Sequence, residues 1–178
     1  MLIFSTEEFF SYKVRQAIKE DTPSVVKMLT NAASWLKENG VDQWSYLHSG
    51  KENNEIEAAI IKGTTYVLED DEGKFIASFN LSPEQNDWDL ELWGNTNDQA
   101  LYVHRLVVAR GQHKKDIGKK LLAWMIKNID QKIESIRLDC IGHNRVLNLF
   151  YQDAGFTYVG SHDMGGELFS KYERPLRL

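Results

Sequence analysis

Apolar residues follow helical spacing in some parts of the chain and form strand-like runs in others. Over residues 25–36 they recur about every three to four positions, directly after a threonine and a proline that are typical of a helix start. The asparagine and glycine at 39–40 predict where this helix ends. Helical spacing also predicts helices within 42–62, over 117–129 and over 144–154.

Short runs of β-branched and aromatic residues predict the strands. The run at 101–109 is the clearest, because Leu106, Val107 and Val108 are continuously apolar and predict a buried central strand with these side chains in the core. The acidic turn at 70–73 ends in a glycine and joins its neighbouring runs into a β-hairpin. The other expected strands cover 12–18, 64–68, 74–81, 135–141, 156–159 and 168–172.

The predicted order is strand, helix, helix, strand, strand, a polar connection over 82–97, then strand, helix, strand, helix, strand, strand. Strands that alternate with helices in the second half indicate an α/β (α+β) fold with some parallel pairing and with helices on the faces of its sheet. A length of 178 residues is most simply one domain. Residues 1–11 would precede that domain as an N-terminal extension.

Composition narrows the classes of function. The formal net charge of −5 disfavours a nucleic-acid binder, which needs a positive face for phosphates. The single cysteine, Cys140, allows no intrachain disulfide and no cysteine-rich zinc site, so no metal is expected. Neither a signal peptide nor an apolar run long enough for a membrane is recognisable, so a cytoplasmic protein without a membrane partner is expected.

One segment of this acidic chain is strongly basic. The cluster consists of Arg110, His113, Lys114, Lys115, Lys119 and Lys120. It lies between a predicted strand and a predicted helix, where free helix amides and the helix dipole favour an anion. Gly118 lets a ligand approach the backbone closely. The alternative is a solvated loop and helix face with no ligand.

The spacing of glycines separates the phosphate-binding motifs. A Walker A loop needs Gly-x-x-x-x-Gly-Lys-Ser/Thr, and a dinucleotide fold needs Gly-x-Gly-x-x-Gly. Neither spacing is present at Gly111 to Gly118. These two classes of nucleotide binder are therefore disfavoured.

The segment from His113 to Gly118 resembles the core motif of the GCN5-related N-acetyltransferase (GNAT) family, Gln/Arg-x-x-Gly-x-Gly/Ala after a central strand. His113 stands in place of Gln or Arg, and Asp116 in place of the first glycine. An acidic side chain near a diphosphate is unfavourable unless it points away. The run from Asn144 to Phe156 resembles the family's downstream signature, an asparagine, a short helix with a tyrosine, and then Gly-Phe.

The resemblance covers nearly the whole chain and implies a GNAT-like mixed central sheet of six to seven strands with helices on both faces. It implies acetyl-CoA as co-substrate and an amine acceptor as the second partner, and it leaves a homodimer open. By resemblance, the backbone of the central strand pairs with pantetheine and the asparagine approaches the same arm. The implied CoA-binding residues are Leu106, Val107, Val108, His113, Lys114, Asp116, Ile117, Gly118, Lys119 and Asn144.

Two residues are candidates for proton transfer. Tyr151 is the candidate general acid, because a phenol is protonated at neutral pH and can donate to a leaving thiolate. His104 is the candidate base, since histidine titrates in the useful range, and strand alternation gives it the same face as Leu106. A packing role for the tyrosine and a structural role for the histidine stay open. Asp89 and Glu91 are rival bases.

The function that these features predict is transfer of an acetyl group from acetyl-CoA to a primary amine of a small molecule or peptide, by direct attack on the thioester. A non-catalytic CoA-binding or acyl-CoA-binding module of the same fold is the first alternative. An unrelated α/β protein with a solvated basic loop is the second.

Overall fold

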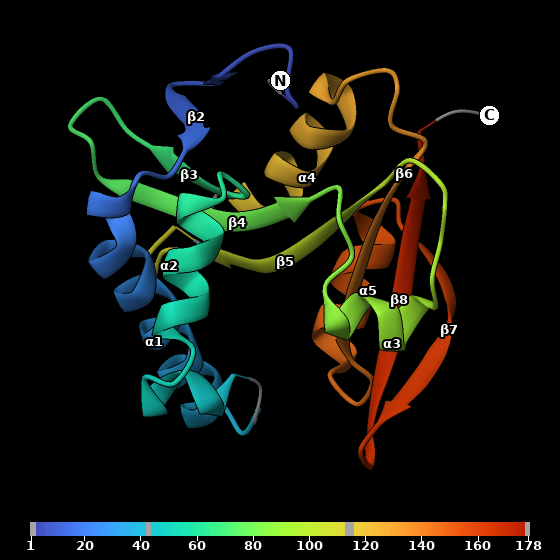
Figure 1. The fold of residues 1–178 in the computed structure, drawn as a ribbon. Coiled ribbons are helices and arrows are strands. Elements are labelled where there is room, and N and C mark those ends of the chain that lie inside the picture. Colours follow the sequence, from blue (N-terminus) through green and yellow to red (C-terminus); the bar gives the residue numbers. More distant parts are fainter. Residues whose placement is uncertain (1–2, 42–43, 113–115, 177–178) are drawn as a thin grey trace. The chain divides into compact units, whose positions relative to one another are not determined.

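The computed structural model describes residues 3–41, 44–112 and 116–176, and Figure 1 shows its helices and strands. In chain order they are β1 (Glu8–Phe9), β2 (Tyr12–Gln16), η1 (Lys19–Asp21), α1 (Thr22–Glu38), η2 (Ser45–Ser49), α2 (Asn53–Ile61), β3 (Thr65–Glu69), β4 (Phe75–Ser82), α3 (Asp87–Trp93), β5 (Ala100–Val108), α4 (Ile117–Asn128), β6 (Ser135–Ile141), α5 (Arg145–Asp153), β7 (Thr157–Met164) and β8 (Glu167–Pro175).

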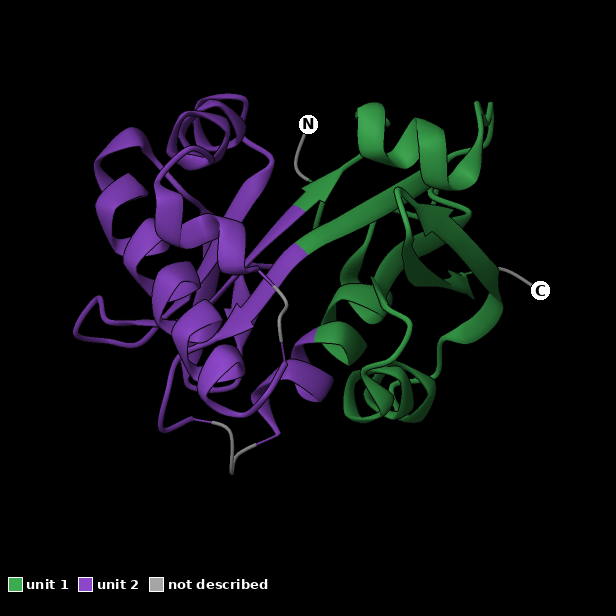
Figure 2. Cartoon of the chain, turned by 90° about the horizontal axis from the view of Figure 1, so that it is seen from below, with its two compact units in different colours: residues 1–5, 81–104, 122–178 green, residues 6–80, 105–121 purple. Residues whose placement is uncertain are grey.

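The chain divides into two compact units, coloured separately in Figure 2. Unit 1 contains residues 1–5, 81–104 and 122–178, and unit 2 contains residues 6–80 and 105–121. The strand order is β1-β2-β3-β4-β5-β6-β8-β7. The chain passes from one unit to the other between residues 5 and 6 and again within β4, β5 and α4.

Unit 2 is built on antiparallel strands and two helices. The strands β1 to β4 pair antiparallel in sequence order. The helices α1 and α2 contact each other and run side by side in Figure 1. Their apolar faces pack with the strand residues Val67 and Val107, because each helix buries its residues at helical spacing. The buried helix residues of this core are Val25, Leu29, Ala33, Ile56 and Ile60.

Unit 1 combines a parallel and an antiparallel pairing. The start of β5 pairs parallel with β6, with Leu101 beside Ile136. Next, β6 pairs antiparallel with β8, and β8 pairs antiparallel with β7 in the long hairpin of Figure 1. Leu101, Leu122 and Ile136 are fully buried, so these strands and the second part of α4 have an apolar core of their own.

The predicted mixed α/β class is confirmed, and the strand count is eight instead of six to seven. The additional strand, β1, has only two residues, too short for a hydrophobic period to reveal. The predicted second helix is divided into η2 and α2, and Trp44 and Gly50, both with positive φ, flank η2. The polar connection contains α3, which sequence periodicity did not predict. None of the described helices is long and apolar enough to cross a membrane.

Candidate active site

A kink interrupts β5 within the candidate site. Arg105 has φ of 50°, in the left-handed region that side chains other than glycine rarely adopt. Such a conformation costs about 1–3 kcal/mol, which surrounding contacts must offset. Within unit 2, Arg105 Nη2 lies 2.9 Å from Glu52 Oε2 and 3.4 Å from Glu55 Oε2, and both glutamates belong to the start of α2. The kink interrupts the alternation of side chains along the strand. The prediction that His104 and Leu106 lie on the same face, which depends on that alternation, therefore no longer holds.

The three apolar residues after the kink are not equally buried. Val107 is 4% exposed and belongs to the core of unit 2. Leu106 and Val108 are only partly buried, so the prediction that all three side chains are core residues is wrong for these two. Successive side chains of a strand point to opposite sides, so Leu106 and Val108 point away from the core that Val107 enters. Their predicted pairing with pantetheine involves the backbone and stays a prediction.

The start of α4 carries the described part of the basic segment. Asp116 is exposed and has φ of 53°, and its carbonyl oxygen accepts the amide of Lys120 at 3.0 Å. Ile117 is buried, whereas Lys119 is exposed and Gly118 lies in the first helical turn. The family motif has glycine where Asp116 stands, and glycine adopts positive φ without strain. His113 and Lys114 lie outside the described residues.

A capping box starts α3 in unit 1. The side chain of Asn86 accepts the amide of Asp89 at 2.8 Å, and the Asp89 carboxylate accepts the amide of Asn86 at 3.2 Å. Reciprocal bonds of this kind satisfy helix amides that otherwise lack partners. They also fix the Asp89 side chain, which is 1% exposed.

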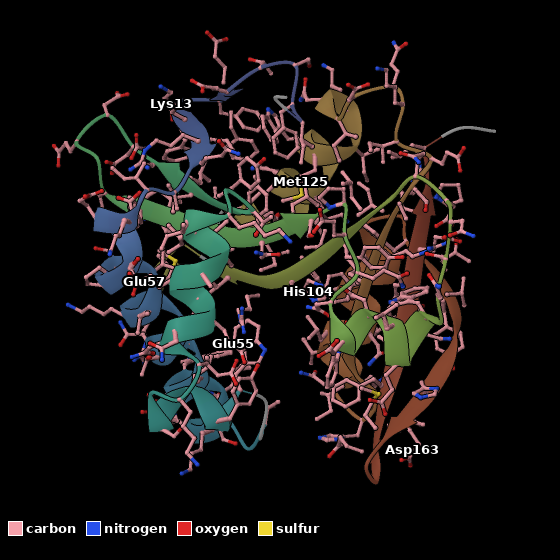
Figure 3. All side chains as sticks on the ribbon, in the orientation of Figure 1. Lys13, Glu55, Glu57, His104, Met125 and Asp163 are labelled. Carbon is pink, nitrogen blue, oxygen red and sulfur yellow. The ribbon has the colours of Figure 1, made fainter. Side chains whose placement is uncertain are left out.

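The same aspartate holds the candidate base. Asp89 Oδ2 lies 3.1 Å from Nε2 of His104, at the end of the unit 1 part of β5. Figure 3 labels His104 on this strand. The histidine side chain keeps 18% of its surface exposed, so the imidazole is held from one side and reaches solvent on the other. In this pair a buried carboxylate contacts a partly exposed imidazole and fixes its orientation.

A second carboxylate lies in the electrostatic range of this pair. The indole Nε1 of Trp88 donates to Asp139 Oδ1 at 3.3 Å, and the indole ring packs edge-on against Phe169 at 4.8 Å between centroids. Burial raises the pKa of Asp139 to about 6, with a smaller rise from the charge of Asp89, while the charge of His104 and the bond from Trp88 lower it. The carboxyl group of Asp139 therefore changes its protonation state near pH 6.

The candidate acid, Tyr151, is buried on α5. Its ring lies among those of Phe150, Phe156 and Tyr172, at centroid distances of 5.3, 6.3 and 5.8 Å. Burial raises the pKa of the phenol well above its ordinary value, and the charges of Cys140 and Asp139 raise it further. Burial also raises the pKa of Cys140 to about 12. Both groups therefore keep their protons at neutral pH.

The asparagine of the downstream signature begins α5. The side chain of Asn144 accepts the amide of Leu147 at 3.1 Å, as the N-cap of the helix. One turn later, Asn148 donates to the carbonyl oxygen of Asn144 at 2.8 Å and accepts from Tyr172 at 2.8 Å. The capping role explains an asparagine at position 144 without a ligand, and the predicted contact with the pantetheine arm stays a prediction.

Sequence reasoning left three features of these units unassigned: the kink at Arg105, the Asp139–Trp88 bond and the pairing of Asp89 with His104. A signal existed for Asp89 alone. An asparagine followed three residues later by an acidic residue is the pattern of a capping box, which would have predicted α3. The other two depend on contacts distant in sequence.

A small cavity of unit 2 lies beside the kink. Its polar lining consists of Thr65, Ser78, Asn80 and Arg105. Its volume of about 10 Å³ is room for about one water molecule.

Comparison with known proteins agrees with this fold. The family model described as an acetyltransferase (GNAT) domain matches residues 62–158, more than half of the chain. The uncharacterized N-acetyltransferase YesJ of Bacillus subtilis is 34% identical over 157 residues, which cover 87% of each chain. The chain belongs to the GNAT family of acetyltransferases.

Solved structures share the fold. A GNAT-family acetyltransferase from Listeria monocytogenes superposes with a TM-score of 0.76 at 30% identity, covering 92% of this chain and 94% of that one. A GNAT-family acetyltransferase from Streptococcus agalactiae gives a TM-score of 0.80 at 18% identity, covering 96% and 98%. At that lower identity, the second likeness concerns the fold alone.

Proposed function

We propose that the chain is a single acetyltransferase domain that transfers an acetyl group from acetyl-CoA to a primary amine of a small molecule or peptide. The observation that carries the proposal is the imidazole of His104, held 3.1 Å from a buried carboxylate in a chain of the GNAT family. Amine acylation needs a neutral nucleophile, and an oriented imidazole can take the proton that the amine must lose.

In this proposal, the described residues Leu106, Val107, Val108, Asp116, Ile117, Gly118, Lys119 and Asn144 bind the co-substrate together with His113 and Lys114. The chemical support is the segment from β5 to α4, a strand that leads through a basic run into a helix start. Free amides and the helix dipole favour the diphosphate there. No step of the reaction requires a metal.

The amine nitrogen attacks the thioester carbonyl carbon, so that a carbon–nitrogen bond forms and the carbon–sulfur bond breaks. His104 accepts the proton of the amine, and Tyr151 is the acid for the leaving sulfur. The raised pKa of Tyr151 keeps its proton in place. Because an ordinary thiol has a pKa near ~8.5, the phenol stabilises the thiolate by donating a hydrogen bond more readily than by giving up its proton.

The second candidate function is a CoA-binding module without turnover. The exposed Asp116 at the start of α4 favours it, because a negative charge there opposes the binding of a diphosphate. Titration calorimetry with acetyl-CoA and an assay of released CoA thiol distinguish the two. Binding with thiol release in the presence of an amine is the expected result. Binding without release across a panel of primary amines would favour the module, and absence of binding would contradict both.

A further inference from the structure

Asp89, the buried carboxylate beside the candidate base, has no role in the reaction steps described above. Asp89 is 1% exposed, and its Oδ2 accepts the backbone amide of Asn86 at 3.2 Å as well as facing His104 Nε2 at 3.1 Å. Its other oxygen, Oδ1, is buried and has no hydrogen-bond partner in the described part of the chain. A carboxylate tied to a helix start and shielded from solvent cannot swing out to contact an amine. The rival role of Asp89 as the base itself is therefore disfavoured.

Hydrogen-bond direction assigns the imidazole nitrogens. An ionised carboxylate can only accept hydrogen bonds, so Asp89 Oδ2 accepts from the Asn86 amide and from His104 Nε2, and Nε2 then carries the proton. The other ring nitrogen, Nδ1, is then the one with a lone pair. Among the residues that the structure describes, none is hydrogen-bonded to Nδ1. The nitrogen that is free to act as a base is therefore Nδ1.

We propose that Asp89 is the positioning residue of the transfer reaction, which holds the Nε2 proton of His104 so that Nδ1 takes the proton of the acceptor amine. This inference rests on the proposed function. As the amine attacks, its proton moves to Nδ1 and the imidazole becomes an imidazolium with both nitrogens protonated. The negative Asp89 carboxylate stabilises that cation in place. The proton later passes from the exposed side of His104 to solvent.

The capping box supplies matched variants. Asp89→Asn keeps an oxygen for the Asn86 amide but removes the negative charge. Asn86→Ala removes the bond from the Asp89 amide to the Asn86 side chain and keeps the Asp89 carboxylate. Asp87→Asn removes a charge from the same first turn, at an exposed position. The readouts are kcat and KM for acetyl-CoA, measured by release of CoA thiol with an amine that the wild type acetylates.

We expect Asp89→Asn to lower kcat by about 10- to 100-fold with KM for acetyl-CoA unchanged, because general base catalysis contributes at least that much. Asn86→Ala should keep kcat within about threefold while it lowers the melting temperature, as loss of a cap does. Asp87→Asn should behave as the wild type. A kcat for Asp89→Asn near the wild-type value would overturn the proposal. A loss for Asn86→Ala as large as that for Asp89→Asn would also overturn it, since the helix and not the carboxylate would then matter.

A measurement without substrate separates this inference from the proposed function. Nitrogen-15 NMR of ¹⁵N-histidine-labelled protein reports which imidazole nitrogen carries the proton, with His104→Gln used for assignment. For the neutral imidazole of His104 in the wild type, we expect a proton on Nε2 and none on Nδ1. A proton on Nδ1 would overturn the inference even if the enzyme acetylates amines. If no amine is acetylated, the proposed function fails, and the NMR result still decides the role of Asp89 in the pair.

Discussion

The described charged residues of unit 2 that are proposed to bind CoA lie at the surface, whereas the residues of unit 1 that are proposed to act in proton transfer are largely withdrawn from water. Asp116 and Lys119 are exposed at the start of α4. Asp89 and Tyr151, by contrast, are 1% and 7% exposed. The difference separates two kinds of chemistry: exposed charges attract an anion at little cost, whereas burial raises the pKa of the Tyr151 phenol.

This contrast predicts different sensitivities to substitution. Solvent screens an exposed charge, so that each one contributes roughly 0–1 kcal/mol. A buried titratable group interacts with its neighbours through a medium that screens less, and its pKa changes accordingly, as those of Asp139 and Tyr151 do. Substitutions in the unit 1 cluster should therefore change rates strongly, and those at the start of α4 should change affinity mildly.

The largest effect is expected from Tyr151→Phe. Loss of the phenol should reduce kcat by about 100-fold or more, because a hydrogen-bond donor placed against the developing negative charge contributes on the order of 10²–10³. Acetyl-CoA affinity should change much less, since the aromatic ring is retained. Stopped-flow release of CoA thiol gives the rate, and calorimetry gives the dissociation constant.

The matched control for this variant is Tyr158→Phe. Tyr158 is a half-exposed tyrosine of unit 1, and its hydroxyl is 2.7 Å from Ser161 Oγ. Its removal should leave kcat within about twofold. An unchanged rate for Tyr151→Phe would remove Tyr151 from the mechanism.

An intermediate effect is expected on stability from Asp139→Asn. The pKa of Asp139 in the folded chain is about 6, above the ordinary value of 3.8, so the folded state binds the proton more tightly than the unfolded state. The free energy of unfolding of the wild type should therefore lose this contribution as pH rises from about 4 through 6. The variant lacks this loss and keeps an oxygen for the Trp88 indole.

The stability difference between Asp139→Asn and the wild type should shift in favour of the variant by up to about 3 kcal/mol between pH 4 and pH 7.5. Urea unfolding at both pH values measures it. The charged groups that act on Asp139 are His104 and Asp89, so the titration should be repeated in His104→Gln. The exposed Asp153→Asn is the control. A difference that does not vary with pH would mean that Asp139 is not withdrawn from water.

The smallest effect is expected from Asp116→Gly. The substitution relieves a positive φ of 53° and removes a negative charge at the proposed diphosphate site. Acetyl-CoA should bind about two- to fivefold more tightly, the effect of one exposed charge. The free energy of unfolding should change by no more than about 1 kcal/mol.

Asp116→Ala separates the two causes, because it removes the charge and keeps a side chain at positive φ. Calorimetry should give the tighter binding for both variants if charge is the cause. Tighter binding for glycine alone would assign the effect to the backbone. Weaker binding for both would contradict a diphosphate at this position.

The sequence alone predicts those features that depend on interactions between residues close together in the chain. Periodicity predicted α1, α4, α5 and most strands, because helical and strand spacing require only neighbouring residues. The basic segment at α4 was visible for the same reason. By contrast, the bond of Trp88 to Asp139 joins residues that are 51 positions apart, and that of His104 to Asp89 joins residues 15 apart. No local pattern specifies such pairs, so these two contacts could be found only in the structure.

Acetyl transfer to an amine is tested most directly by the mass balance of the reaction. Purified protein, acetyl-CoA and a panel of primary amines are incubated, and mass spectrometry quantifies acetylated amine and free CoA in the same sample. At least one amine should give both products in equal amounts, and Asp89→Asn and Tyr151→Phe should strongly reduce both. CoA release without an acetylated amine, or equal product formation by these two variants and the wild type, would contradict the proposed mechanism.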